Sequence, residues 1–287
     1  MLRKKRRNAG KSRKYFMQDL TVSTIQSKLE WEQIDLNLSN LESIIGNLPL
    51  TDVIILPEMF STGFSMNAQK LAEEPNGKTT LWMHAMAKKA QALLMGSIIC
   101  KDSSQYYNRL IITRPDGGIL TYDKRHLFRM AKEDETYSYG SDRKTFNWKG
   151  WNILPLVCYD LRFPVWSRNK GDKNGLEYDL LIYVANWPAQ RISAWDILLK
   201  ARAIENLSYC IGVNRIGIDG NGIKYNGHTG IYDPKGNPIY FSEKEESVTT
   251  VISGEELVSY RNKFPANMDS DEFEIKQNDQ FVNKLNF

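Results

Sequence analysis

Five short segments of the chain are apolar at nearly every position, which leaves neither side of a β-strand suited to water. Strands of this kind are buried on both faces, so helices or a second sheet must cover them. Segments with the spacing of amphipathic helices lie between them. We therefore predict an α/β protein built from layers of sheets and helices. The strand segments are 52–60, 92–100, 151–158, 178–186 and 208–215, and the helical segments are 30–48, 79–91 and 190–206.

Antiparallel strands are expected as well. Residues 106–124 are typical of a hairpin around a Pro-Asp-Gly-Gly turn, and residues 227–240 of a second hairpin around Pro-Lys-Gly-Asn. Residues 20–26 and 247–253 complete the predicted strands, so two or more mixed sheets are expected. Neither an internal repeat nor a long linker divides the sequence. Residues 17–287 are therefore predicted to form one domain, with a polar C-terminal segment on its surface.

Positive charge is concentrated at the N-terminus. The formal net charge is +4, but residues 1–16 alone hold eight Lys or Arg and no acid, which leaves −4 for the rest. Such a tail can bind nucleic acid or an anionic membrane surface. The alternative, which we adopt, is a disordered or over-called start with Met17 as the initiator, and no nucleic-acid or membrane partner. No apolar run reaches the roughly eighteen residues of a membrane span.

The cysteines indicate a reducing compartment. There are three, Cys100, Cys158 and Cys210, and three cannot all pair. The three histidines are scattered, and no cluster has the spacing of metal ligands. We therefore expect a cytoplasmic protein without a metal or another cofactor.

Reactive side chains follow three of the predicted strands. Glu58 ends one strand segment, Lys124 follows the first hairpin, and Cys158 ends a third segment. Ligands and catalytic groups of sheet proteins gather just beyond strand ends, so these three side chains are predicted to meet in one cleft. The alternative is that the two charged groups face water and that the cysteine is inert, as we expect for Cys100 and Cys210.

The residues after Cys158 favour a reactive thiol. A helix that begins at Asp160 would direct its N-terminal dipole at the sulfur and lower the thiol pKa. A thiolate could attack a carbonyl carbon while Glu58 handles the proton. Lys124 and the next backbone N–H would stabilise the oxyanion. His126 could instead form a Cys–His dyad, although nothing in the sequence places it beside the sulfur.

Several long motifs resemble a known family, the nitrilase superfamily of carbon–nitrogen hydrolases. They are "LPEMFSTGF", "YDKRHLFRMA", "LPLVCYDLRFPVWSRN", "YVANWP", "ARAIENLSY" and "FPANMDSDEF". The resemblance runs from about residue 20 to about residue 273 and is closest to the bacterial omega-amidases. It implies an α-β-β-α sandwich that pairs in a homodimer. It also implies that Cys158 is the nucleophile, Glu58 the general base and Lys124 the oxyanion stabiliser.

The resemblance implies further site residues. The family has a second glutamate seven residues before a glycine, which corresponds to Glu133 before Gly140, although Glu135 lies close by. This carboxylate would hold the lysine. The oxyanion partner would be the backbone N–H of Tyr159, and Trp187 matches a position where omega-amidases place an aromatic ring over the substrate.

Arg162 lies four residues after Cys158, one helical turn along. Its guanidinium could bind a substrate carboxylate in bidentate fashion, or it could form a salt bridge with Asp160 or another acid. The omega-amidase resemblance supports the first reading. It implies hydrolysis of the ω-amide of a 2-oxo dicarboxylic acid monoamide, such as 2-oxoglutaramate or 2-oxosuccinamate.

Three alternatives stay open on the sequence alone. The same machinery could hydrolyse another linear amide, a carbamoyl amine or a nitrile. The basic tail could make the protein a binder of nucleic acid or membrane surfaces. The chain could also be an inactive scaffold of the same fold.

Overall fold

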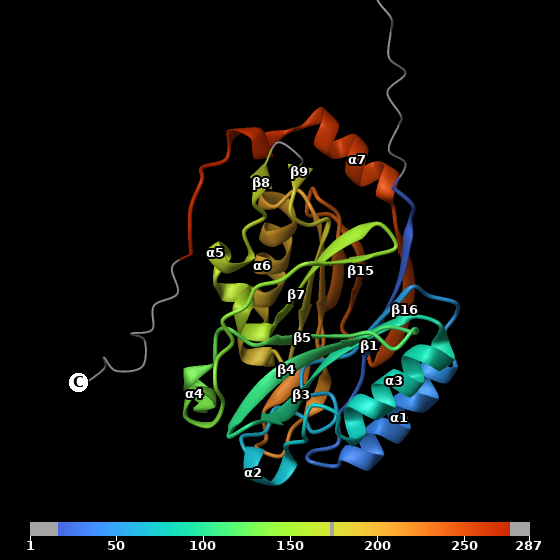
Figure 1. Ribbon diagram of the computed structural model, residues 1–287, viewed down its shortest axis with the longest axis vertical. Coiled ribbons are helices and arrows are strands. Elements are labelled where there is room, and N and C mark those ends of the chain that lie inside the picture. Colours follow the sequence, from blue (N-terminus) through green and yellow to red (C-terminus); the bar gives the residue numbers. More distant parts are fainter. Residues whose placement is uncertain (1–16, 173–174, 276–287) are drawn as a thin grey trace, which may run out of the picture.

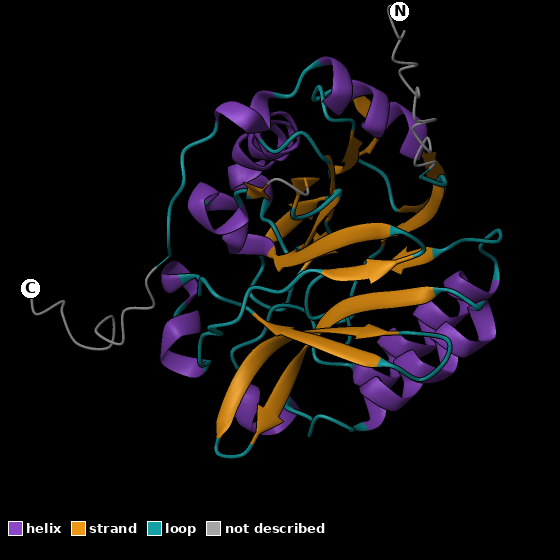
Figure 2. Cartoon of the chain, turned by 45° about the horizontal axis from the view of Figure 1, so that its top comes forward, coloured by secondary structure: helices purple, strands orange, loops and turns teal. Residues whose placement is uncertain are grey.

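Two six-stranded mixed sheets face one another, and helices cover their outer faces (Figure 1). This is the α-β-β-α sandwich predicted from the sequence. The computed structural model describes residues 17–172 and 175–275, so the predicted basic tail at residues 1–16 lies outside the described residues. Figure 2 shows the strands of the two sheets stacked between the helical layers.

The first sheet has the strand order β16-β1-β2-β3-β4-β5. Its three central strands, β1, β2 and β3, are parallel, and β16, β4 and β5 run antiparallel to their neighbours. The C-terminal strand β16 therefore closes the edge beside the first strand of the chain. The bounds are β1 Leu20–Gln26, β2 Val53–Ile55, β3 Leu93–Asp102, β4 Gln105–Thr113, β5 Ile119–Asp123 and β16 Glu246–Ile252.

The second sheet repeats this plan with the order β15-β14-β11-β10-β7-β6. Three parallel strands, β7, β10 and β11, are again flanked by one antiparallel strand on one side and two on the other. The bounds are β6 Phe146–Trp148, β7 Trp151–Val157, β10 Leu180–Val184, β11 Tyr209–Val213, β14 Thr229–Tyr232 and β15 Pro238–Ser242.

Helices α1 and α3 lie side by side on the outer face of the first sheet, and α5 and α6 cover the second (Figure 1). Helix α7 crosses one end of the molecule. Among the described residues, no helix is long and apolar enough to cross a membrane. The bounds are α1 Ile34–Gly46, α2 Ala68–Leu71, α3 Lys78–Ala90, α4 Glu133–Thr136, α5 Pro164–Ser167, α6 Ile192–Glu205 and α7 Gly254–Lys263.

The remaining elements are short. Two-stranded ribbons pair β8 with β9 and β12 with β13, and four single turns are 3₁₀-helical. The bounds are β8 Gly171–Asp172, β9 Gly175–Leu176, β12 Ile216–Ile218, β13 Lys224–Asn226, η1 Arg129–Ala131, η2 Cys158–Arg162, η3 Ala189–Arg191 and η4 Ala266–Asp269.

Strand β2 shows why its residues must all be apolar. Val53 and Ile55 point into the core between the two sheets, and Ile54 points into a second core beneath α1 and α3. All three side chains are fully buried. Because alternate residues of a strand face opposite sides, a strand between two cores has no position left for a polar group.

Most predicted elements lie within a few residues of the observed ones, but the helix expected from Asp160 is wrong. A 3₁₀ turn, η2, occupies Cys158–Arg162, and the short helix α5 starts afresh at Pro164. Proline disfavours helical conformation in the residue before it, so the two turns cannot join into one helix. Helix α7 was not expected, although Ser253 caps it by accepting a hydrogen bond from the backbone N–H of Glu256.

The packing of α6 on the second sheet can be tested at Gly212 in β11. A Cβ atom there would overlap the side chain of Leu199 and lie 2.6 Å from a ring carbon of Trp195, both on α6. Gly212→Val should therefore lower the free energy of unfolding by about 1–3 kcal/mol, as overpacked cores do. Urea denaturation measures the change.

Gly46→Ala is the matched control for this prediction. Gly46 is the last residue of α1, and a Cβ atom there would have nothing within 4 Å. The control should keep or slightly raise stability, because alanine is the better helix former. Equal urea midpoints for Gly212→Val and the wild type would contradict the packing described here.

Candidate active site

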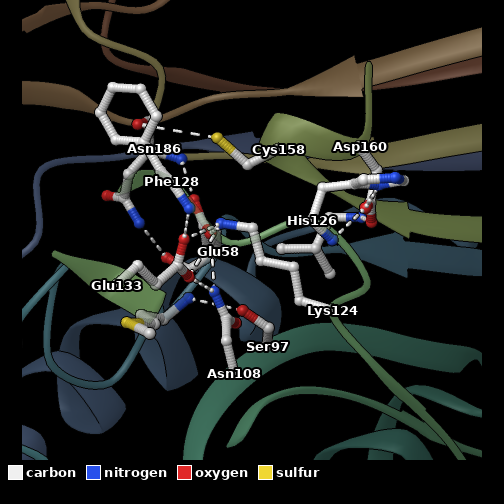
Figure 3. A network of polar contacts seen from close by, with 12 residues as sticks. Glu58, Ser97, Asn108, Lys124, His126, Phe128, Glu133, Cys158, Asp160 and Asn186 are labelled. Atoms are coloured by element: carbon white, nitrogen blue, oxygen red, sulfur yellow. Dashed lines mark hydrogen bonds and ion pairs between the residues drawn. The ribbon is translucent and has the colours of Figure 1, made fainter. Parts of the chain in front are cut away.

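The polar residues that follow the strands meet where the two sheets abut. Glu58 comes shortly after β2 and Lys124 directly after β5, both in the first sheet, whereas Cys158 follows β7 of the second. Figure 3 shows these side chains with Glu133 around one centre. The structure therefore brings together the three groups that the sequence predicts to converge.

Lys124 lies between two carboxylates. Its Nζ is 2.9 Å from Oε1 of Glu58, and 2.9 and 2.8 Å from the two carboxylate oxygens of Glu133 (Figure 3). The three side chains are at most 1% exposed. Burial alone would lower the pKa of Lys124, but the charges of Glu133 and Glu58 outweigh burial and raise it. The lysine is therefore a fixed cation.

Asn108 completes this group and was missed by the sequence analysis. Its side-chain amide donates to Oε1 of Glu58 at 2.8 Å and to Oε1 of Glu133 at 3.0 Å. Its backbone carbonyl accepts from the N–H of Lys124 at 3.0 Å. No sequence signal singles it out, because Arg109 follows it directly and β4 holds two more polar residues, Gln105 and Thr113. An amide with two donors holds both glutamates as acceptors.

Glu58 also connects the two sheets. Its second oxygen, Oε2, accepts the backbone N–H of Asn186 at 2.7 Å, and the Asn186 side chain donates back to the Glu58 carbonyl at 2.5 Å. Asn186 lies just beyond β10 of the second sheet. Both oxygens of the Glu58 carboxylate are thereby fixed in direction.

Cys158 sits at a strained bend. Its φ is +43°, in the left-handed region that non-glycine residues rarely adopt. Its Sγ lies 3.9 Å from the carbonyl oxygen of Asn186 (Figure 3). Such strain persists only where the surroundings enforce it, and it is often found at functional sites.

The predicted lowering of the Cys158 pKa is wrong. Burial, followed by the negative charge of Glu58, raises the pKa of Cys158 well above its ordinary value, and Lys124 opposes this only in part. The physical reason is that η2 is a single turn instead of a helix with a full dipole, while a carboxylate lies beside the sulfur. At neutral pH the residue is a thiol and needs a base to react.

The structure also distinguishes the two candidate glutamates of the loop after Lys124. Glu133 is fully buried, and its Oε2 accepts the backbone N–H of Phe128 at 2.6 Å. Burial raises the pKa of Glu133, and the charge of Lys124 acts against this. Glu135 is exposed and pairs with Lys132 at 3.6 Å. Of these two glutamates, only Glu133 contacts Lys124.

His126 is not paired with the thiol. Its Nδ1 lies 2.8 Å from Oδ1 of Asp160 (Figure 3). Its ring stacks on Phe163, with 3.8 Å between the ring centres. The other oxygen of Asp160 accepts the backbone N–H of Val157 at 3.0 Å and the Tyr122 hydroxyl at 2.8 Å. The Asp160 carboxylate thus ties the turn at Cys158 to the segment around Lys124, and the alternative Cys–His dyad does not form.

A cavity of about 660 Å³ opens onto the thiol, and the remaining predicted residues line it. They are Tyr159, Arg162 and Trp187. The Arg162 guanidinium lies 5.1 Å from the centre of the Trp187 ring. Within residues 17–172 and 175–275 no carboxylate lies within ion-pair distance of Arg162, so the alternative salt bridge to Asp160 is not observed. No group of three or more potential metal ligands occurs in the same residues.

Comparisons with known proteins identify the family of the chain. A model of the carbon-nitrogen hydrolase family matches residues 21–261. The chain therefore belongs to the carbon-nitrogen hydrolase family and is a hydrolase of carbon–nitrogen bonds, which confirms the resemblance to the nitrilase superfamily.

Two individual relatives are similar to this chain over most of its length. The omega-amidase YafV of Escherichia coli (strain K12) is 44% identical over 263 residues, which cover 90% of this chain and 100% of that protein. A 2-oxoglutaramate amidase of Bacillus subtilis (strain 168) is 31% identical over 250 residues, or 85% of this chain and 95% of the relative.

Among solved structures, a superfamily protein of Xanthomonas campestris carries an arsenic adduct in its active site. It matches with a TM-score of 0.89 and 42% identity, covering 91% of this chain and 100% of that one.

The effect of Glu58 on the thiol can be tested by alkylation. Because the Glu58 charge raises the Cys158 pKa, Glu58→Gln should form the thiolate at lower pH. Iodoacetamide reacts with the thiolate, so the pH midpoint of Cys158 alkylation should shift downward in this variant. Mass spectrometry of the peptide that contains Cys158 measures the rate, and Cys158→Ser serves as the blank. An unchanged or higher midpoint would contradict the assigned electrostatics.

Proposed function

We propose that this protein is an omega-amidase. It hydrolyses the ω-amide of 2-oxo dicarboxylic acid monoamides, 2-oxoglutaramate or 2-oxosuccinamate, to the 2-oxo acid and ammonia. The observation that carries the proposal is one cavity lined by the buried thiol of Cys158, by Lys124, whose Nζ contacts the buried Glu58, and by Arg162, which has no acidic partner among the described residues. The similarity to relatives named omega-amidase and 2-oxoglutaramate amidase supports it.

The first step is attack on the amide. Glu58 accepts the thiol proton as Sγ of Cys158 bonds to the amide carbon. The carbonyl electrons move onto the oxygen, and this oxyanion lies between Nζ of Lys124 and the backbone N–H of Tyr159. Lys124 suits this role because its raised pKa keeps it protonated. Glu133 keeps the ammonium in place by contacting it through both carboxylate oxygens.

The second half of the reaction uses the same base. Glu58 returns its proton to the amide nitrogen, the C–N bond breaks, and ammonia leaves behind a thioester on Cys158. Glu58 then takes a proton from water as the water oxygen attacks the thioester carbon. Collapse of this intermediate releases the 2-oxo acid, and the sulfur regains a proton. One water is consumed, and every proton passes through a carboxylate whose two oxygens are held in fixed directions.

Arg162 recognises the substrate carboxylate in this proposal. Its guanidinium lies over the Trp187 ring, which leaves its donors for a planar, bidentate partner. The amide end then points toward Cys158, and the Trp187 ring lies against the substrate's carbon chain.

The proposal also covers the domain organisation and the cellular location of the protein. Residues 17–287 form one hydrolase domain that works in the cytoplasm, and residues 1–16 are a basic tail outside it. The family match over residues 21–261 supports a single domain. The three cysteines are free and buried, which suits a reducing compartment.

We also propose a homodimer that pairs through the outer helical layer. Ile197 and Ile204 are two turns apart on α6, and they are 65% and 49% exposed. Sedimentation equilibrium should give twice the monomer mass, and Ile197→Glu should shift it toward the monomer because a charge at an apolar contact disfavours association. A monomeric wild type would contradict this pairing.

The activity itself is tested by ammonia release from a panel that contains 2-oxoglutaramate, 2-oxosuccinamate, glutamine, asparagine and a simple nitrile. The 2-oxo amides should be preferred. Glu58→Gln should lower kcat by about 10²–10⁴-fold, as loss of a general base does. Circular dichroism checks that the variant is folded. Preference for a nitrile or a simple amide, or activity that survives Glu58→Gln, would overturn the proposal.

A further inference from the structure

A second guanidinium in the cavity has no role in the mechanism above. Arg191 ends the turn η3, before α6, and it lines the same cavity as Cys158. Its guanidinium carbon lies 5.5 Å from the centre of the Phe128 ring, and Nη2 lies 3.3 Å from the sulfur of Met130. A ring face and a thioether are weak acceptors, so most of the five N–H donors of Arg191 stay available.

The acids that line the cavity are already satisfied. Glu32 accepts the Ser65 hydroxyl at 2.7 Å and lies 3.8 Å from Lys70. Asp219 accepts the Tyr225 hydroxyl at 3.0 Å, and one of its oxygens accepts two backbone N–H groups at 2.9 Å each. In the described part of the chain, neither acid forms an ion pair with Arg191 or Arg162. Among the described lining residues, the two guanidiniums are the cations without an acidic partner.

The two arginines rest on separate aromatic platforms beside the thiol. Arg162 lies over Trp187, which follows the residue whose carbonyl contacts Sγ of Cys158. Arg191 lies over Phe128, whose ring meets the edge of Tyr159 at 5.1 Å. A guanidinium over an aromatic ring keeps its N–H donors free for other partners, so both arginines offer donors to a ligand in the cavity.

The two aromatic platforms are connected through the backbone of Arg191. The carbonyl oxygen of Arg191 accepts the indole N–H of Trp187 at 2.9 Å. This contact does not use the Arg191 side chain, so replacing that side chain leaves the support of Trp187, and therefore of Arg162, in place. The roles of the two guanidiniums can thus be separated by substitution.

We propose that Arg191 is a specificity-determining residue that binds the 2-oxo oxygen of the substrate while Arg162 binds the neighbouring carboxylate. The inference rests on the proposed function. A keto oxygen accepts hydrogen bonds from a guanidinium. The 2-ammonium group of glutamine cannot, because it only donates and carries the same charge. Arg191 thereby selects the 2-oxo acid amide over the amino acid amide, and this discrimination needs no change at Cys158.

The test compares kcat/KM for three amides that differ only at carbon 2: 2-oxoglutaramate, glutaramate, which has a methylene there, and glutamine. Arg191→Met should lower kcat/KM for 2-oxoglutaramate by about 10- to 100-fold, mainly through KM, because a hydrogen bond from a charged donor is lost. The kcat/KM for glutaramate should fall far less, so the ratio of kcat/KM for 2-oxoglutaramate to that for glutaramate should become smaller. The ratio of kcat/KM for 2-oxoglutaramate to that for glutamine should become smaller too, because a charge that repels the glutamine ammonium is removed.

Two matched variants complete the design. Arg162→Met should lower kcat/KM for 2-oxoglutaramate and glutaramate by similar factors, since both carry the carboxylate. Arg129→Met removes a positive charge from the turn beside the cavity without touching its lining, because Arg129 is exposed and paired with Asp134. It should leave all three values unchanged.

Equal losses for 2-oxoglutaramate and glutaramate in Arg191→Met, or no loss for either, would overturn the inference while the proposed function stands. An unchanged ratio of kcat/KM for 2-oxoglutaramate to that for glutamine in this variant would overturn the inference as well. A wild type that does not hydrolyse 2-oxoglutaramate at all would overturn the proposed function, and this inference with it.

Discussion

The buried ammonium of Lys124 between two carboxylates is the interaction on which the site depends. Taking three charges out of water is costly, and removal of any one would leave the others uncompensated. The arrangement is tolerated because each oxygen of Glu58 and Glu133 accepts at least one hydrogen bond, from the lysine, from Asn108 or from a backbone N–H. Two negative charges against one positive charge leave an excess of negative charge beside the thiol. After burial, the negative charge of Glu58 contributes most to the raised pKa of the Cys158 thiol.

The same interaction shows why the enzyme needs both sheets. Each sheet has three parallel strands flanked by antiparallel ones. Glu58 and Cys158 follow parallel strands of the two sheets, and Lys124 follows the antiparallel strand β5. The base and the cation come from the first sheet, and the thiol from the second. Reciprocal hydrogen bonds between Glu58 and Asn186 join the ends of β2 and β10 across the interface. The apolar core between the sheets therefore sets the spacing of the reacting atoms, so the site is only as precise as that packing.

Sequence reasoning succeeded where a property is local. Apolar runs with no polar face predicted the doubly covered strands, and reactive residues at strand ends predicted the meeting of Glu58, Lys124 and Cys158. It failed where the property arises from residues distant in the chain. Asn108 sits in a strand whose pattern gives no sign that its amide bridges two glutamates. The direction of the Cys158 pKa shift was wrong because the residues after the thiol suggested a helix dipole, whereas Glu58, which dominates after burial, approaches from the other sheet. Arg191 carries no motif, and its place in the cavity follows from the fold of η3.

A thiol that stays protonated at rest changes how the reaction must begin. Enzymes with a preformed thiolate carry a nucleophile that oxidants and stray electrophiles also reach. In the proposed mechanism, burial and the nearby carboxylate keep the proton on the sulfur until an amide occupies the cavity, so deprotonation and attack belong to one event. The strained bend at Cys158 aids this event because the sulfur is already held at the end of β7, beside the base and facing the cavity. The positive groups needed for the oxyanion are fixed before substrate arrives, so reaction requires little rearrangement of the protein. In the proposed mechanism, Glu58 thus has two effects on the same sulfur: its charge holds the resting thiol in its inert form, and its carboxylate accepts the proton once the amide carbon is within reach.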